Sequence, residues 1–98
     1  MKLTYHPDAE GELVEAVRFY EGREPGLGSR FLRDFDAAIA AILAAPYRWR
    51  VVEDDVRRLV MRRFPYGIYY RQEGDDIRIL VVKHHSRHPD YWKYRLGS

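Results

Sequence analysis

The sequence predicts an α+β fold in which an N-terminal strand and an antiparallel helical hairpin pack on a small, mainly antiparallel sheet, in the order β-α-α-β-β-β. Three observations favour this class. The chain has 98 residues, which suits one domain. Apolar residues make up 46% and charged residues 33%, as in globular domains. Apolar residues recur at helical spacing up to Pro46 and in strand-like runs after it. Residues 1–98 are therefore expected to form a single domain.

The N-terminal segment is expected to form a short strand and then a helix. Residues 2–5 suit a strand, and Pro7 and Asp8 suit the first turn of a helix that runs from about Asp8 to Arg23. The apolar residues of this helix recur at helical spacing, with polar residues between them. The apolar set is Leu13, Ala16, Val17 and Tyr20, and the polar set is Glu12, Glu15 and Arg18.

A second helix is expected after a break at residues 24–28, where a proline and two glycines interrupt the helical pattern. Its apolar stripe consists of Leu27, Phe31, Phe35, Ala38, Ile39 and Ile42. Pro46 stops this helix. Because the connection between the helices is short, they should pair as an antiparallel hairpin.

Three strands are expected in the second half of the chain. They are residues 56–63, 68–70 and 77–82, separated by turns at 64–67 and 73–76. The last of them is apolar almost throughout, which is typical of a central strand. The polar and aromatic tail that follows should form a loop or a single helical turn.

The charge of the chain is unevenly distributed. Residues 1–46 carry five basic and eight acidic side chains, a net charge of −3, whereas residues 47–98 carry twelve and seven, a net charge of +5. Fourteen of the seventeen cations are arginine, which suits phosphates and carboxylates. Such a basic half favours an anionic partner, either nucleic acid or an acidic protein segment. A solvated charged surface is the simpler alternative.

Several features predict a protein with neither a signal peptide nor a membrane span, and favour the cytoplasm. The N-terminus has no apolar signal region. The longest apolar run, residues 37–45, is far shorter than the about 20 residues that span a bilayer. The chain has no cysteine, which excludes disulfides, thiolate zinc sites and cysteine nucleophiles.

The first candidate surface is an arginine ladder on the segment 56–63, formed by Arg57, Arg58, Arg62 and Arg63. Residues two apart share a face of a strand, so each face would carry two of these arginines. Because one face must meet the helices, the pattern suggests a bulge or an edge strand. The arginines could simply keep such an edge soluble. The functional alternative is that guanidinium groups gather on one open surface and bind an anionic partner.

The second candidate is the run Lys-His-His-Ser-Arg-His at residues 83–88, directly after the strongest strand. Imidazoles transfer protons near neutral pH, and an arginine beside them stabilises developing negative charge. These groups would suffice for metal-free RNA cleavage, in which a base activates the 2′-hydroxyl and an acid protonates the leaving oxygen. The spacing of His84, His85 and His88 matches no standard zinc ligand set, so neither a metal nor a cofactor is expected. The histidines could equally be ordinary surface groups.

Aromatic side chains are interleaved with these charges, and exposed aromatics beside arginine stack on unpaired bases. Most of them should belong to the core. Tyr69 or Tyr70 must face inward, because neighbours on a strand alternate, and Trp92 should close one end of the core. Tyr66 and Tyr91 are the candidates for partner contact.

These segments, taken in order, resemble the RelE/ParE toxin superfamily over nearly the whole chain. The resemblance is carried by residues 9–21, 26–31, 45–49, 56–58, 64–70 and 82–92, and includes the turn Phe64-Pro65-Tyr66-Gly67. The resemblance implies a compact toxin of a bacterial type II toxin–antitoxin pair. It also implies a cognate antitoxin whose extended, acidic C-terminal segment wraps the toxin in a hetero-oligomer.

Two activities occur in this superfamily. RelE-like members cut messenger RNA on the ribosome without metal, whereas ParE-like members inhibit DNA gyrase without catalysis. By resemblance to the nuclease branch, Arg62, Arg87 and Tyr91 are catalytic candidates. His85 is added to them because its imidazole could replace a missing base or acid. Candidates for binding nucleic acid or a protein partner are Arg57, Arg58, Arg63, Tyr66 and His84.

The sequence departs from the nuclease pattern at Gly67, where many nucleases place an arginine. Its basic strand residues are arginines, whereas several nucleases use lysines. A ribosome-dependent endoribonuclease, a gyrase inhibitor and an inert antitoxin-binding relative therefore all remain open at this point.

Overall fold

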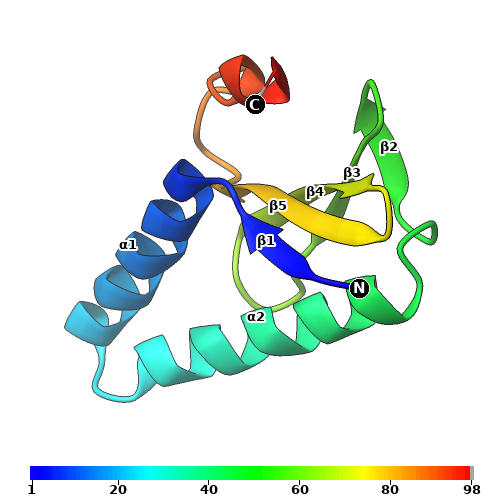
Figure 1. The fold of residues 1–98 in the computed structure, drawn as a ribbon. Coiled ribbons are helices and arrows are strands. Elements are labelled where there is room, and N and C mark those ends of the chain that lie inside the picture. The colour runs from blue at the N-terminus through cyan, green and yellow to red at the C-terminus, as the bar shows by residue number, and fades with distance from the viewer. Residues whose placement is uncertain (98) are drawn as a thin grey trace.

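The computed structural model describes residues 1–97, which form two layers around one mixed sheet (Figure 1). The strand order is β1-β5-β4-β3-β2, with β1 parallel to β5 and every other neighbouring pair antiparallel. The elements are β1 (Leu3–Tyr5), α1 (Pro7–Arg23), α2 (Leu27–Ala44), β2 (Arg50–Glu53), β3 (Val56–Val60), β4 (Tyr66–Glu73), β5 (Asp76–His84) and the 3-10 helix η1 (Lys93–Gly97). The predicted α+β fold is confirmed. Within the described residues, no helix is long and apolar enough to cross a membrane.

Local chemistry explains where the two helices begin and end. His6 caps α1 by accepting a hydrogen bond at Nδ1 from the Asp8 backbone N–H (3.1 Å), and Pro7 occupies the first helical position. The connection to α2 turns at Gly26, whose φ of 89° suits glycine. α2 ends at Ala44, just before Pro46. Gly28 was predicted to belong to the break at residues 24–28, but it is buried in the first turn of α2.

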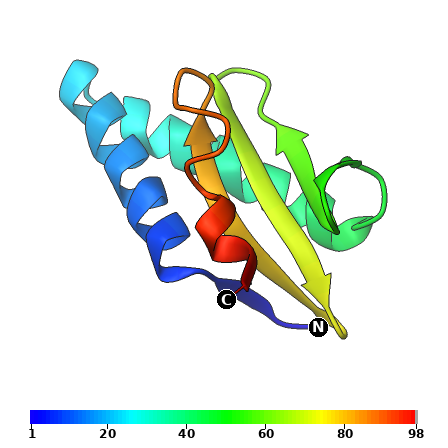
Figure 2. The same cartoon turned by 90° about the horizontal axis from the view of Figure 1, so that it is seen from above.

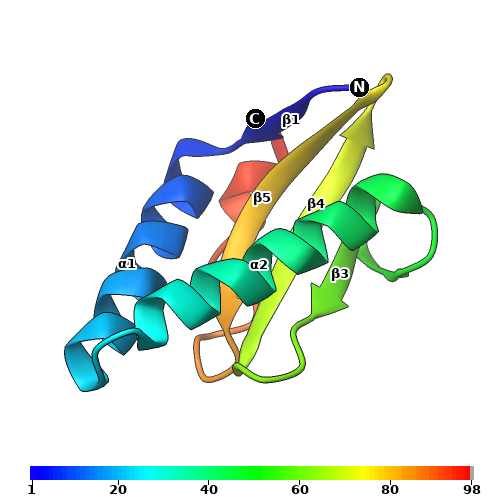
Figure 3. The same cartoon turned by 90° about the horizontal axis from the view of Figure 1, so that it is seen from below.

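The two helices cover one face of the sheet, and the C-terminal segment covers the other (Figures 1 and 2). α2 runs across β5 and β4 when the sheet is seen from the helical side (Figure 3). The core under the helices includes Phe31, Phe35, Ile68 and Ile79. The second core, on the opposite face, consists of Val56, Tyr69, Leu80, Val81 and Trp92. Trp92 is thus buried, but on the face away from the helices.

The arginine ladder is not one strand, which corrects the prediction from sequence. β3 ends at Val60, and Arg62 and Arg63 lie in the turn that leads to β4. β3 is also not an edge, because β2, a strand that the sequence pattern did not reveal, pairs along its first half. The bulges lie elsewhere, in β2 and between Tyr69 and Tyr70 of β4. Both of these tyrosines are buried, on opposite faces of the sheet.

Candidate functional site

Glu12, in the first half of α1, is the centre of a polar cluster that joins α1, β5 and the C-terminal segment. Its side chain is only 9% exposed. The Arg95 guanidinium donates to Oε1 at 2.8 Å and to Oε2 at 3.0 Å, and the Val82 backbone N–H donates to Oε1 at 3.0 Å. The Tyr91 hydroxyl donates to Oε2 at 2.5 Å. The carboxylate is therefore well supplied with donors, which a buried charge requires.

Two of the four predicted catalytic residues, Arg87 and Tyr91, are bound to this carboxylate. Arg87 lies 3.8 Å above the Tyr91 ring and 3.4 Å from Oε2 of Glu12. Burial and the hydrogen bond to Glu12 raise the pKa of the Tyr91 hydroxyl. A hydroxyl that already donates to a carboxylate, and that holds its proton this firmly, is poorly suited to proton transfer.

A separate group of basic residues consists of Arg58 in β3, Lys83 near the end of β5 and His85 directly after β5. Arg58 and Lys83 lie on the face of the sheet away from α1 and α2. Lys83 is only 6% exposed, and its ammonium donates to the carbonyl of His84 at 3.3 Å. Burial, then the charges of Arg58 and Arg87, lower its pKa. Burial, then Lys83, His84 and Arg58, lower the pKa of His85. A positive potential is thus concentrated where the side chains of His85 and Arg58 meet solvent.

Arg62 and Arg63, the second half of the predicted ladder, line a hollow of about 450 Å³ beside α2. Its walls also include Arg48, Trp49 and the small side chains of α2. Arg62 is therefore placed in a different part of the molecule from the Glu12 cluster, and the four predicted catalytic residues do not form one site.

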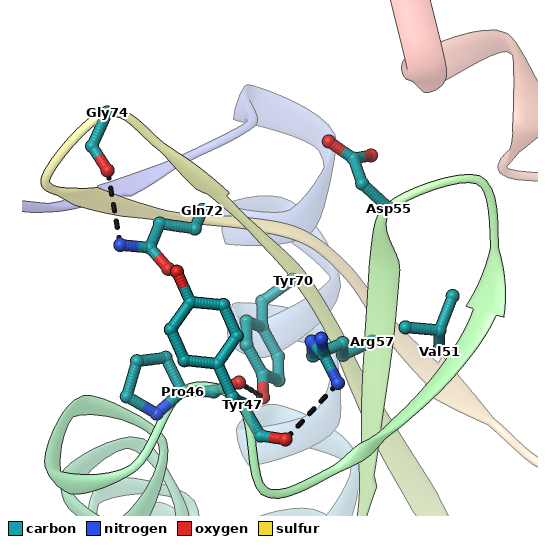
Figure 4. Close-up of a pocket in the computed structure, with 8 residues that line it drawn as sticks. All are labelled: Pro46, Tyr47, Val51, Asp55, Arg57, Tyr70, Gln72 and Gly74. Atoms are coloured by element: carbon teal, nitrogen blue, oxygen red, sulfur yellow. Dashed lines mark hydrogen bonds between the residues drawn. The ribbon is translucent and has the colours of Figure 1, made fainter.

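Arg57 supports a loop and does not face open solvent as a free cation. Its Nη1 donates to the carbonyls of Tyr47 (3.2 Å) and Trp49 (2.8 Å), and the Tyr70 hydroxyl donates to the carbonyl of Pro46 at 2.6 Å. Arg57, Tyr70, Pro46 and Tyr47 line a hollow of about 330 Å³ beyond the end of α2 (Figure 4). The two hydrogen bonds explain why Arg57 is held on the helical side of the sheet.

Tyr66 and His84 are neighbours across β4 and β5, with ring centroids 5.1 Å apart. Tyr66 is buried against Phe31 and Tyr20, and His84 accepts a hydrogen bond at Nδ1 from the Ser86 backbone N–H at 2.9 Å. Both line a hollow of about 310 Å³ whose walls also include Glu12 and Arg87.

The expectation that the arginines share one open surface is wrong. Arg57 lies beside the 330 Å³ hollow, Arg62 and Arg63 lie beside α2, and Arg58 lies on the opposite face of the sheet.

Comparison with known proteins identifies the family. A family model described as "ParE toxin of type II toxin-antitoxin system, parDE" matches residues 3–89, which is most of the chain. The chain belongs to the ParE toxin family. Two proteins named Toxin ParE2, from Mycobacterium tuberculosis strains CDC 1551 and H37Rv, are each 30% identical to it over 90 residues. The match covers 91% of this chain and 86% of each relative.

A solved structure described as the chromosomal ParDE TA system from P. aeruginosa has the same fold. Its TM-score is 0.74 at 23% sequence identity, and the alignment covers 86% of this chain and 95% of that chain. As a ParE-family member, the protein is the toxin component of a toxin–antitoxin system and has an antitoxin as its partner.

In this ParE-family chain, the residues that sequence reasoning missed are Glu12, Lys83 and Arg95. Helical periodicity placed Glu12 among the polar positions of α1, and nothing local indicates that the C-terminal segment covers it. Lys83 was noticed only as part of a basic run. The signal for its burial is its place two residues after Val81, because residues two apart on a strand share a face.

Proposed function

We propose that this ParE-family toxin acts by binding, as an inhibitor of DNA gyrase that its antitoxin neutralises. The observation that carries the proposal is the attachment of Arg87 and Tyr91 to Glu12. With these groups bound to an internal carboxylate, and with Arg62 beside α2, the acid and base of a nuclease are not assembled around one phosphate. The match of the ParE family model over residues 3–89 supports the same activity.

The direct test is a supercoiling assay with purified gyrase and relaxed plasmid. We expect the toxin to inhibit supercoiling, and the cognate antitoxin, added in equimolar amount, to restore it. Growth arrest in cells, together with unimpaired supercoiling and no trapped cleavage complex in vitro, would reject gyrase as the target.

A second activity, ribosome-dependent cleavage of messenger RNA, is supported by the environment of His85. Its lowered pKa favours the neutral imidazole near pH 7, which could accept a proton, and the positive charges of Arg58 and Lys83, which contribute to that shift, would stabilise a phosphate bound beside it. Primer-extension mapping of translated messages after induction tests it. New 5′ ends that disappear with His85→Gln would favour the nuclease, and intact transcripts during growth arrest would exclude it.

A further inference from the structure

Lys83 is a buried lysine with no acidic partner. The residue is 6% exposed, and within residues 1–97 the only hydrogen bond of its ammonium group is the 3.3 Å contact with the carbonyl of His84. No carboxylate of residues 1–97 forms an ion pair with it. Lysine is almost never buried without a partner, because removing an ammonium group from water is costly. A group kept at such a cost is a candidate for binding.

Sheet register places Arg58 on the same face as Lys83. Val60 pairs with Gly67, and Gly67 pairs with Lys83. The adjacent row, Leu59, Ile68 and Val82, belongs to the core under the helices, so the row that contains Lys83 faces away from them. Arg58 is two residues before Val60 and therefore shares its face of the sheet. Its side chain passes over Gly67, since a Cβ built on Gly67 would be only 3.3 Å from the Arg58 Cδ. The missing side chain at residue 67 therefore leaves room for the Arg58 stem between β3 and Lys83.

His85 completes the group from the turn after β5. Its backbone N–H donates to the carbonyl of Pro65 at 2.9 Å, which fixes the turn against the loop between β3 and β4. Its side chain is exposed. Neither Arg58 nor His85 forms an ion pair with an acid in the part of the chain that the structure describes. Three basic groups thus share this end of the sheet, where the charges of Lys83 and Arg58 act on His85, and none of them has a counter-charge among residues 1–97.

We propose that Arg58, Lys83 and His85 form a binding site for a phosphate group of a nucleic-acid backbone. Arg58 and His85 supply N–H donors at the surface, and Lys83 supplies positive charge from beneath them. A phosphodiester offers two oxygens that donors from several directions can share, whereas a single arginine fork already satisfies a planar carboxylate. The three residues line none of the three hollows described above, and such an open site suits a polymer backbone better than an enclosed small molecule.

This inference is independent of catalysis, because binding requires no acid or base. If the toxin inhibits gyrase, the site would contact the DNA that gyrase holds. The binding experiment below uses no gyrase, so its failure can be distinguished from failure of the gyrase proposal.

The test compares Lys83→Met with Lys2→Met. The second variant is a matched control, because it removes the same charge from an exposed lysine outside the proposed site. Binding to a labelled DNA duplex of about 20 base pairs is measured by fluorescence anisotropy over a range of salt concentrations. We expect Lys83→Met to weaken binding about tenfold and to reduce the salt slope by about one, as for loss of a phosphate contact. Lys2→Met should change neither appreciably.

Thermal unfolding provides a second measurement. Without DNA, Lys83→Met should unfold at a higher temperature than the wild type, because methionine is buried there without desolvating a charge. A destabilised Lys83→Met would contradict the claim that the lysine is unpaired. His85→Gln, at an exposed position, should also weaken DNA binding while leaving the unfolding temperature in place, and it serves as the binding test if Lys83→Met fails to fold.

Two further probes identify the ligand. Inorganic phosphate should compete with DNA only at high concentration, and tight binding of inorganic phosphate alone would overturn the assignment to a polymer. If polyglutamate binds with the same dependence on Lys83 and DNA does not, the site is for an acidic protein segment and the proposal is wrong. Equal DNA binding by Lys83→Met and Lys2→Met would also overturn it.

Discussion

Arg95 and Glu12 form a bidentate ion pair that joins the C-terminal segment to α1. The two N–O distances are 2.8 and 3.0 Å, and the side chains are 4% and 9% exposed. Arg95 also donates to the carbonyl of Leu80 at 2.9 Å, so the pair is attached to β5 as well. The C-terminal segment is thereby held over the second core, where Trp92 packs on Tyr69.

Removing the charge of Glu12 should therefore destabilise the whole domain. Glu12→Gln leaves the Arg95 guanidinium buried without its carboxylate, and breaking a buried pair in this way costs about 3–5 kcal/mol. Urea unfolding measures the loss. Glu15→Gln, an exposed glutamate on the same helix, is the control and should change the free energy of unfolding by less than about 0.5 kcal/mol. Equal effects of the two substitutions would mean that the pair contributes little.

Tyr91→Phe should leave toxicity intact. Its hydroxyl donates to Glu12 at 2.5 Å, so its loss should cost about 1–2 kcal/mol of stability and no chemical step. Growth arrest after induction, compared at matched protein levels, is the measurement. If a folded Tyr91→Phe variant no longer arrests growth, the hydroxyl takes part in the chemistry and the nuclease activity is favoured.

Gly28 and Gly22 should respond to alanine in opposite directions. A Cβ at Gly28 would lie 2.6 Å from the carbonyl oxygen of Val17 and 2.9 Å from Cβ of Glu21, so Gly28→Ala must push α1 and α2 apart. We expect a loss of about 1–3 kcal/mol. At Gly22, in the last turns of α1, nothing lies within 4 Å, and Gly22→Ala should stabilise by about 0.5–1 kcal/mol. Thermal unfolding of both variants tests whether the helices are this close.

Stability should fall as the solution is acidified through the histidine range. Burial, then the charge of Arg95, lowers the pKa of His6 in the folded protein. At a pH between this lowered pKa and the ordinary pKa of the unfolded chain, the unfolded chain binds more protons than the folded protein, so acidification favours unfolding. The stabilisation is complete above the ordinary value of about 6.5 and is lost as the pH falls through the folded value. Protonation of His6 at Nδ1 also removes the acceptor for the Asp8 N–H, and this helix-capping hydrogen bond contributes about 1 kcal/mol.

The variant His6→Asn isolates this contribution. Asparagine caps helices well and does not titrate, so its free energy of unfolding should vary less between about pH 7.5 and pH 5. The lowered pKa of His85 acts in the same direction and remains in both proteins. Identical pH profiles for wild type and variant would exclude His6 as a source of the dependence.

Patterns in the sequence predicted those elements whose residues interact mainly with residues close to them in the sequence. The helical hairpin, the β4–β5 hairpin and the interior position of β5 follow from spacing, proline and glycine positions, and apolar runs. β2 was missed because it is a short edge strand, and its residues Arg50–Glu53 become a strand only by pairing with β3. The end of β3 at Val60 was missed for a related reason, since alternation of side chains continues into the turn.

The order of the elements apart from β2, the family resemblance and the positive charge of the second half could all be read from the amino-acid sequence. What the tertiary structure decided is how each charged group is used. Glu12 and Arg95 are far apart along the chain, and only the folding of the C-terminal segment over the sheet brings them together. Lys83 lies in a basic run like its neighbours, yet the sheet buries it, and no carboxylate of residues 1–97 forms an ion pair with it. Charge is a property of a residue, but the cost of burying it and the partner that offsets that cost depend on atoms distant in sequence.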